Sequence, residues 1–327
     1  MNTSLNQKLV PILAGLLVLQ LLIAAGLNLG DSGYDPAAKN TPLAAIDPET
    51  IDNILIDDGK NSVELVKLDG RWQVSEVEFP ANDDNVDKLL GILSNLDMGL
   101  PVATTEEAAD RFRVTEDNFS RKIVLSQAGD VVAELFIGGA PALRKVHARL
   151  AGDNNTYSVE FNPFDALATA DDWIDKQILN RDIANITRAE LPIATLVRQD
   201  NALVVEGLKE DQQTNAEEAE SLLKKVAELQ IQSVLGKSLE NPGKAVDTFK
   251  LTLKDGQEIS YDITKPEDQH YYVLKSSDQP FYFKVATYKI NPILETERER
   301  LVQAKEAEAP KEDTTAVAAA KEDDSKS

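Results

Sequence analysis

The chain alternates short strand-like segments with two longer helical patterns, and this order occurs twice. In the first half, strand-like segments precede a helix from about Asp83, whose apolar positions recur at three- and four-residue spacing. In the second half, strand-like segments beginning at 193–199 precede a helix from about Asn215. Asp and Gly, which adopt the backbone angles that tight turns need, separate the strands. The pattern predicts an α+β fold of two similar halves, each a curved antiparallel sheet with a packed helix.

Matching positions support this duplication. The pair Leu89-Leu90 in the first helix corresponds to Leu222-Leu223 in the second, and the loop residue Asp153 corresponds to Asp278. Between the halves, Trp173 is expected to anchor their junction, because a tryptophan buries a large apolar area.

A long apolar segment precedes the first half. Residues Leu9 to Leu29 carry no charge, and a helix of that length spans about 31 Å, close to the hydrocarbon thickness of a bilayer. Lys8 precedes the segment and Asp31 follows it, which favours a cytoplasmic N-terminus and an exported remainder. The segment is therefore predicted to be an uncleaved signal anchor. A cleavable signal peptide, with Ala24-Ala25-Gly26 as its cleavage motif, is the alternative.

These patterns divide the chain into five parts. The expected bounds are a signal anchor at 1–30, a tether at 31–48, a first α+β repeat at 49–180, a second at 181–302 and a disordered acidic tail at 303–327. Prolines and small polar residues indicate the tether, and the lack of any apolar face indicates the tail. The run from Glu295 to Arg300 is interpreted as a charged helix with i, i+3 pairs.

Charge excludes one class of partner. The chain has 34 Lys and Arg against 56 Asp and Glu, a formal net charge of −22. Nucleic-acid binding depends on basic surfaces, so no nucleic-acid partner is expected. The chain has no cysteine, which excludes disulfides, thiolate nucleophiles and Cys-ligated zinc.

No residue pattern predicts a catalytic, cofactor-binding or metal-binding site. The histidines His147 and His270 lie far apart in the sequence, and His147 is expected on the solvent-facing side of a strand. The pair Asp83-Asp84 suits a helix N-terminus better than a calcium loop. Gly138-Gly139 is interpreted as a plain turn, because no phosphate-loop motif surrounds it. We therefore expect no enzymatic activity and no cofactor.

Several short motifs, together with the anchor and the tether, form a known pattern. The motifs are Gly70-Arg71-Trp72, Phe112-Arg113-Val114, Arg121–Leu125, Glu134–Gly139, Tyr157, and Trp173 with Asp175-Lys176 and Ile178-Leu179. Over most of residues 45–300 the chain resembles a bacterial family, the domain of unknown function 4340. It departs from that pattern at Val114, which stands in place of a Gly-Leu pair.

The resemblance implies a cellular context. Members of the family are commonly encoded beside components of an ABC exporter of the gliding-motility auxiliary type. This implies a single-pass protein of the bacterial inner membrane, attached through Leu9 to Leu29, with most of the chain on the periplasmic side and ABC transporter membrane subunits as partners. We expect a non-catalytic, membrane-anchored interaction module. The alternative is a periplasmic ligand-binding or hydrolytic domain with a site in the groove between the two halves.

Overall fold

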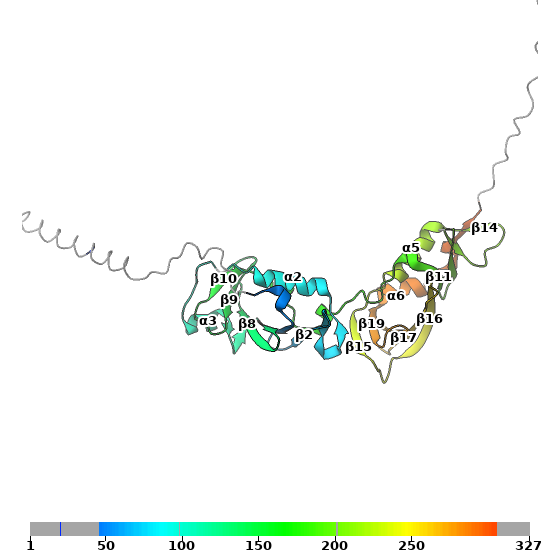
Figure 1. Ribbon diagram of the computed structural model, residues 1–327. Helices are drawn as coiled ribbons and strands as arrows, with labels where there is room; N and C mark the ends of the chain where they lie inside the picture. The colour runs from blue at the N-terminus through cyan, green and yellow to red at the C-terminus, as the bar shows by residue number, and fades with distance from the viewer. Residues whose placement is uncertain (1–19, 21–45, 98, 201, 306–327) are drawn as a thin grey trace, which may run out of the picture. The chain divides into compact units, whose positions relative to one another are not determined.

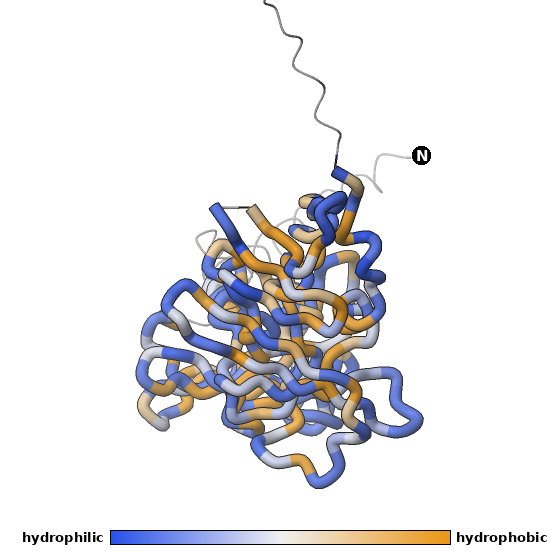
Figure 2. The backbone as a smooth tube through the Cα atoms, turned by 90° about the vertical axis from the view of Figure 1, so that its right-hand side faces the viewer, coloured by the Kyte–Doolittle hydropathy of each residue, from blue (hydrophilic) through white to orange (hydrophobic). Residues whose placement is uncertain are grey.

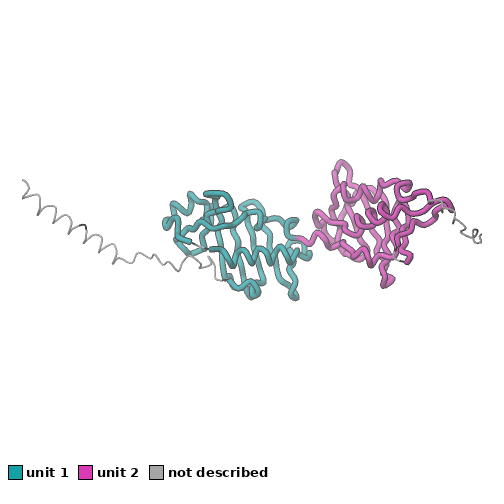
Figure 3. Tube along the Cα trace, turned by 90° about the horizontal axis from the view of Figure 1, so that it is seen from above, with its two compact units in different colours: residues 1–173 teal, residues 174–327 magenta. Residues whose placement is uncertain are grey.

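The chain divides into two compact units. The computed structural model describes Gln20 and residues 46–97, 99–200 and 202–305. Unit 1 ends at Trp173 and unit 2 begins at Ile174 (Figure 3). The predicted anchor Leu9–Leu29 lies outside the described residues apart from Gln20, as do most of the tether and the tail. Among the helices that the structure describes, none is both long enough and apolar enough to cross a membrane.

Unit 1 is built on an eight-stranded antiparallel sheet with the order β10-β9-β8-β7-β1-β2-β3-β4 (Figure 1). Its strands are β1 Asn53–Asp57, β2 Ser62–Leu68, β3 Arg71–Val74, β4 Phe79–Pro80, β7 Arg121–Gln127, β8 Asp130–Ile137, β9 Lys145–Leu150 and β10 Tyr157–Glu160. Apolar and polar residues are interspersed along the folded chain (Figure 2), as expected where successive strand residues point to opposite faces of a sheet.

The long helix α2 (Asp83–Ser94) forms where its apolar spacing predicts it. The Asn82 side chain accepts a hydrogen bond from the Asn85 N–H at 2.9 Å and so caps the helix N-terminus. The acidic pair in the first turn, Asp83-Asp84, complements the helix dipole, as expected from the sequence. The buried face of the helix consists of Val86, Leu89, Leu90 and Leu93.

A smaller layer packs on unit 1. It comprises α3 (Glu106–Phe112) and the hairpin of β5 (Val114–Thr115) and β6 (Asn118–Phe119). Ala109, Val114 and Phe136 form its buried cluster. The sequence pattern did not predict α3, because a seven-residue helix with four charged residues (EEAADRF) shows little apolar periodicity.

Unit 2 contains a second eight-stranded antiparallel sheet, with the order β13-β12-β11-β16-β17-β18-β19-β15. Its strands are β11 Ile186–Glu190, β12 Thr195–Gln199, β13 Ala202–Val205, β15 Ser233–Gly236, β16 Lys244–Leu253, β17 Glu258–Lys265, β18 Tyr271–Ser276 and β19 Tyr282–Ala286. Two helices, α5 (Ala216–Ala227) and α6 (Thr287–Leu294), pack against each other (Figure 1).

The remaining elements are short. Strand β14 (Gln212–Thr214) pairs with β20 (Val302–Ala304), so the first residues that the sequence assigned to the tail are strand residues. The other short elements are α4 Ala170–Trp173 and the 3₁₀ helices η2 Pro48–Thr50, η3 Ser75–Val77, η4 Pro163–Asp165, η5 Ile183–Asn185 and η6 Arg298–Leu301.

The two sheets share one strand order. Unit 1 gives β10-β9-β8-β7-β1-β2-β3, and unit 2 gives β19-β18-β17-β16-β11-β12-β13. In both units a backbone bond returns from the end of the unit to the helix N-cap: Asn82 N–H donates to Trp173 O at 2.7 Å, and Asn215 N–H to Leu301 O at 2.9 Å. The antiparallel α+β class is confirmed, and the shared order supports two similar halves.

Two sequence expectations for unit 2 were wrong. The segment 193–199 was expected to open the sheet, but β11 precedes it; a bulge between Ile186 and Arg188 breaks the alternation that would have revealed this strand. The expected charged helix over Glu295–Arg300 does not form among the described residues. The chain there forms instead the short 3₁₀ helix η6, over Arg298–Leu301. Its arginines bond outward, Arg298 to the Glu206 carbonyl at 2.8 Å and Arg300 to the Glu218 carboxylate at 3.0 Å, rather than to the predicted i, i+3 partners.

Candidate functional site

Two neighbouring hollows in unit 1 lie between α2 and the segment that follows β10. The larger, which we call the open hollow, has a volume of about 570 Å³. The smaller, which we call the Trp173 hollow, has a volume of about 150 Å³. Asp165 of η4 lines both, so the two hollows form one continuous candidate surface.

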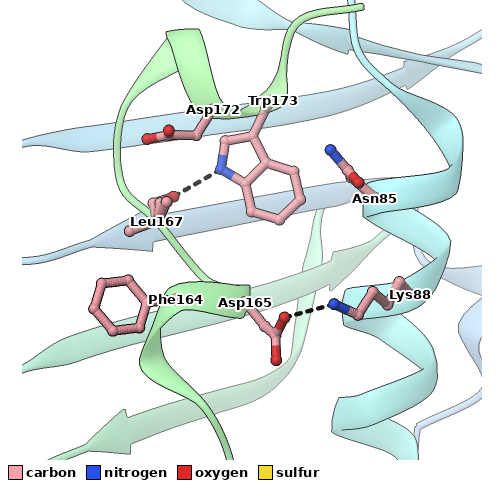
Figure 4. A pocket seen from close by; sticks show the side chains of 7 residues that line it. All are labelled: Asn85, Lys88, Phe164, Asp165, Leu167, Asp172 and Trp173. Atoms are coloured by element: carbon pink, nitrogen blue, oxygen red, sulfur yellow. Dashed lines mark hydrogen bonds and ion pairs between the residues drawn. The ribbon is translucent and has the colours of Figure 1, made fainter.

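Local sequence explains how η4 shapes this surface. The Asn162 side chain accepts a hydrogen bond from Phe164 N–H at 3.2 Å, and Pro163 provides the fixed φ that suits the first residue of a helical turn. This turn places the Asp165 carboxylate 2.7 Å from the Lys88 ammonium on α2 (Figure 4). It also leaves the Phe164 side chain 77 % exposed.

Trp173 holds the end of unit 1 against α2. Its indole N–H donates to the Leu167 carbonyl at 2.7 Å, and its own carbonyl accepts the Asn82 amide described above. Figure 4 shows the ring between the Leu167–Asp172 segment and α2, on the side of Asn85. Trp173 therefore acts as an anchor within unit 1 and forms one wall of the Trp173 hollow.

The open hollow is bounded by α2, by the loop before β9 and by the end of β10. Its lining residues are Ile92, Ala140, Leu143–Val146, Glu160–Pro163 and Asp165. The loop ends in a tight turn in which Lys145 N–H donates to the Ala142 carbonyl at 3.1 Å. Arg144 takes a φ of 59° in that turn, a left-handed conformation that costs an ordinary residue about 1 kcal/mol. The turn leaves Leu143 92 % exposed.

The charges around the hollows are mostly solvated. The Lys88–Asp165 pair has side chains 63 % and 20 % exposed, so it contributes at most about 1 kcal/mol. Arg144 and Lys145 have no ion-pair partner in the part of the chain that the structure describes. Glu160 lies opposite Lys145 in the strand register and adds one negative charge to the same lining. The rim beside Leu143 thus carries two neighbouring positive charges, Arg144 and Lys145, with Glu160 across the strand pair from Lys145.

The side chains that line the hollows suit binding. They include carboxylates, amides, lysines and an arginine, but no Ser, Thr, Cys or His that could act as a nucleophile with its base. Within the described ranges, no group of three or more His, Cys, Asp or Glu is placed to hold a metal ion. The open hollow instead presents the exposed apolar side chain of Leu143 beside the positive charges of Arg144 and Lys145.

The structure corrects the expectation for His147. Its ring stacks on Phe112 of α3, with centroids 4.0 Å apart, and its Nδ1 lies 2.9 Å from the Gly139 carbonyl oxygen. The side chain was expected to face solvent but is half-buried, because α3 covers that face of β9. Burial lowers the pKa of His147 below its ordinary value, against the opposing effect of the bond to Gly139. His270 belongs to unit 2 and is exposed.

The glycine pair also differs from its interpretation as a plain turn. A Cβ on Gly138 would lie 2.1 Å from the Phe112 carbonyl oxygen, and Gly139 N–H donates to that same oxygen at 2.9 Å. Gly138 therefore permits two backbones to approach closely, which only a residue without a Cβ allows. This contact joins the small α3 layer to the base of the loop that carries Leu143.

Sequence reasoning did not predict that Leu143, Arg144 and Phe164 are exposed at this surface. A signal was present for two of them. Leu143 is a large apolar residue in a loop of small residues and proline, and Phe164 follows an Asn-Pro pair that predicts a turn. The exposure of either side chain depends on tertiary packing.

A comparison with protein families matches this region. A family model described as a domain of unknown function (DUF4340) matches residues 72–247, from β3 of unit 1 into β16 of unit 2. The matched range includes α2, η4 and every residue that lines the two hollows. No curated protein and no solved structure matches the chain.

Proposed function

The chain belongs to the DUF4340 family, and from this premise we propose that it is a non-catalytic interaction module anchored in the bacterial inner membrane. In this proposal, Leu9–Leu29 spans the membrane and the two units lie on the periplasmic side. The partners are membrane subunits of an ABC exporter, in keeping with the gene context that the family resemblance implies.

One observation carries the proposal. The two hollows of unit 1 each have one large exposed apolar side chain in their lining. Leu143, in the open hollow, is 92 % exposed, and Phe164, in the Trp173 hollow, is 77 % exposed. Exposing such side chains together beside a concave surface favours association with another protein. Arg144 and Lys145 add the charge that gives such a contact orientation and specificity.

The net charge of the chain fits this role. A protein with a formal charge of −22 is repelled by anionic lipid headgroups at close range. The units are therefore expected to stay away from the bilayer surface, with membrane contact confined to the anchor. The alternative, a ligand or hydrolytic site in a groove between the halves, stays a prediction.

Co-purification tests the proposal. The full chain is purified from its native membranes in mild detergent, and we expect exporter membrane subunits to accompany it. As a control, Leu9–Leu29 is replaced by an unrelated apolar anchor. This variant should retain the same subunits, because recognition is assigned to the units. Recovery of the full chain without any exporter subunit would contradict the proposal.

Protease accessibility tests the topology. Protease added outside spheroplasts should digest both units and leave the membrane segment protected. Digestion only after the membrane is opened would place the units in the cytoplasm and would contradict the proposal.

A further inference from the structure

Unit 2 shows what covers the face that unit 1 leaves open. Helix α6 follows β19 directly and contacts α5, β18 and β19. Its residues Ile290 and Ile293 are fully buried. The Tyr272 hydroxyl of β18 donates to the Asn291 side-chain oxygen of α6 at 3.2 Å. A short helix therefore fills the space between the long helix and the last two sequential strands of the sheet.

The same place in unit 1 is the open hollow. Strands β9 and β10 correspond to β18 and β19 in the shared strand order, and α2 corresponds to α5. Val146 pairs with Val159 one residue before the end of β10, just as Tyr272 pairs with Val285 one residue before the end of β19. Val146 lines the hollow, whereas its counterpart Tyr272 bonds to α6.

The difference arises in the segment after the last strand. In unit 2 this segment begins with the eight residues of α6. In unit 1 it forms the three residues of η4 and, further on, the four residues of α4. Both segments contain an Asn-Pro pair followed by an apolar residue. That residue is Ile293 in unit 2, which is fully buried, and Phe164 in unit 1, which is 77 % exposed. Unit 1 therefore lacks the helix that completes its counterpart.

The loop beside the hollow also differs between the units. In unit 1 the connection before β9 presents Leu143 and Arg144, and β9 begins with Lys145; all three are exposed. In unit 2 the connection before β18 presents Glu267 and Asp268 and has no large apolar residue. Of these two corresponding loops, the one in unit 1 is therefore the apolar and basic one.

We propose that the open hollow of unit 1 binds an amphipathic helix of a partner protein. The apolar side chains of the partner helix occupy the hollow between α2 and β9, in the place that α6 takes between α5 and β18 in unit 2. The carboxylates of the partner helix face Arg144 and Lys145. This is the groove-binding mode in which apolar residues at helical spacing act as anchors. The inference rests on the proposed interaction function and assigns that function to one face of one unit.

Photocrosslinking in native membranes tests this inference. A benzoylphenylalanine is placed at Leu143 of the full chain, and the crosslinked peptides are identified by mass spectrometry. Asp268 provides the matched control, because it is an exposed residue with a φ of 58° in the corresponding loop of unit 2. Crosslinks from position 143 should map to an amphipathic acidic segment of another protein and exceed those from position 268 about tenfold, a factor equivalent to about 1.4 kcal/mol.

Charge reversal provides the second arm. The double change Arg144→Glu and Lys145→Glu should lower the crosslinking yield from position 143 about tenfold, because it removes the electrostatic match to the partner. Both side chains are exposed, so circular dichroism should stay unchanged. Thermal unfolding should shift only slightly downward, because Lys145→Glu places a second carboxylate opposite Glu160.

Several results would overturn the inference. They are crosslinks from position 143 to another copy or another segment of this chain, yields equal to those from position 268, and yields unaffected by charge reversal. If exporter subunits still co-purify in that case, only the assignment to the open hollow fails. If co-purification fails as well, the proposed function fails with it.

Discussion

Units 1 and 2 share an architecture but differ in how one face of it is completed. Both have the same order of seven strands, an asparagine-capped helix and a backbone bond that returns to that cap. In unit 2 the segment after the sheet forms α6 and buries its apolar residues. In unit 1 it forms η4 and leaves Phe164 at the surface. The comparison shows that two units with the same strand order can differ in how far one face of the sheet is covered.

The largest expected effect tests whether each unit has its own core. Leu90 and Leu223 are 2 % and 0 % exposed on the corresponding helices α2 and α5. Leu90→Ala and Leu223→Ala should each lower the free energy of unfolding of their own unit by about 2–5 kcal/mol, through lost burial and the cavity left behind. Hydrogen exchange followed by mass spectrometry should show faster exchange only in the substituted unit. Equal loss of protection in both units would show that the cores are not separate.

The next effect concerns the layer that distinguishes unit 1. Gly138→Ala places a Cβ 2.1 Å from the Phe112 carbonyl and should cost about 1–3 kcal/mol of unfolding free energy, because α3 must move away from the sheet. Denaturant unfolding measures the loss. Gly139→Ala is the control, since a Cβ at that position would lie 3.8 Å from the same carbonyl oxygen, an ordinary contact. Similar losses for the two variants would contradict the close approach at Gly138.

The helix caps provide a smaller and graded comparison. Asn82 accepts from the Asn85 amide at 2.9 Å, and Asn215 accepts from the Glu218 amide at 3.4 Å. Replacing either cap by alanine should cost about 1 kcal/mol, and the shorter bond predicts the larger loss at Asn82. Serine at either position keeps a capping oxygen and serves as the control. A larger loss of unfolding free energy at Asn215 than at Asn82 would contradict the expectation that the cap with the shorter hydrogen bond stabilises its helix more.

The smallest effect is the pH dependence of unit 1. Burial lowers the pKa of His147, so the unfolded chain takes up the proton at a higher pH than the folded chain. His147 therefore reduces stability as the pH falls from above its unfolded pKa of about 6.5 to below its folded pKa. His147→Phe keeps the stack on Phe112 without a titrating group. The difference in Tm, wild type minus variant, should become smaller or more negative between pH 7.5 and pH 5.5. A difference that grows in favour of the wild type would contradict this sign.

Much of the fold follows from the sequence because its strands and long helices have strong local patterns. The apolar spacing around Leu89-Leu90 and Leu222-Leu223 was sufficient to predict α2 and α5. Strand β11 was missed because a bulge interrupts its alternation. The run after Glu295 was misread because its arginines bond to residues 82 and 92 positions away, which local spacing does not reveal.

The candidate site depends on differences between the units that only tertiary structure shows. The two Asn-Pro segments are similar in sequence, yet Phe164 is exposed and Ile293 is buried. That outcome depends on whether the residues around the Asn-Pro pair form an eight-residue helix or a three-residue turn. The left-handed backbone of Arg144 and the close contact at Gly138 likewise have no local signature.

Thiol labelling tests most directly whether the residue after the Asn-Pro pair is exposed in unit 1 and buried in unit 2. The chain has no cysteine, so the single variants Phe164→Cys and Ile293→Cys each report on one position of the folded full chain. The thiol introduced at position 164 should react with a small maleimide at the rate of an exposed thiol. The thiol introduced at position 293 should react at least about a hundredfold more slowly, because its reaction requires an opening that costs about 1.4 kcal/mol for each factor of ten. Comparable rates at the two positions would contradict the difference between the units.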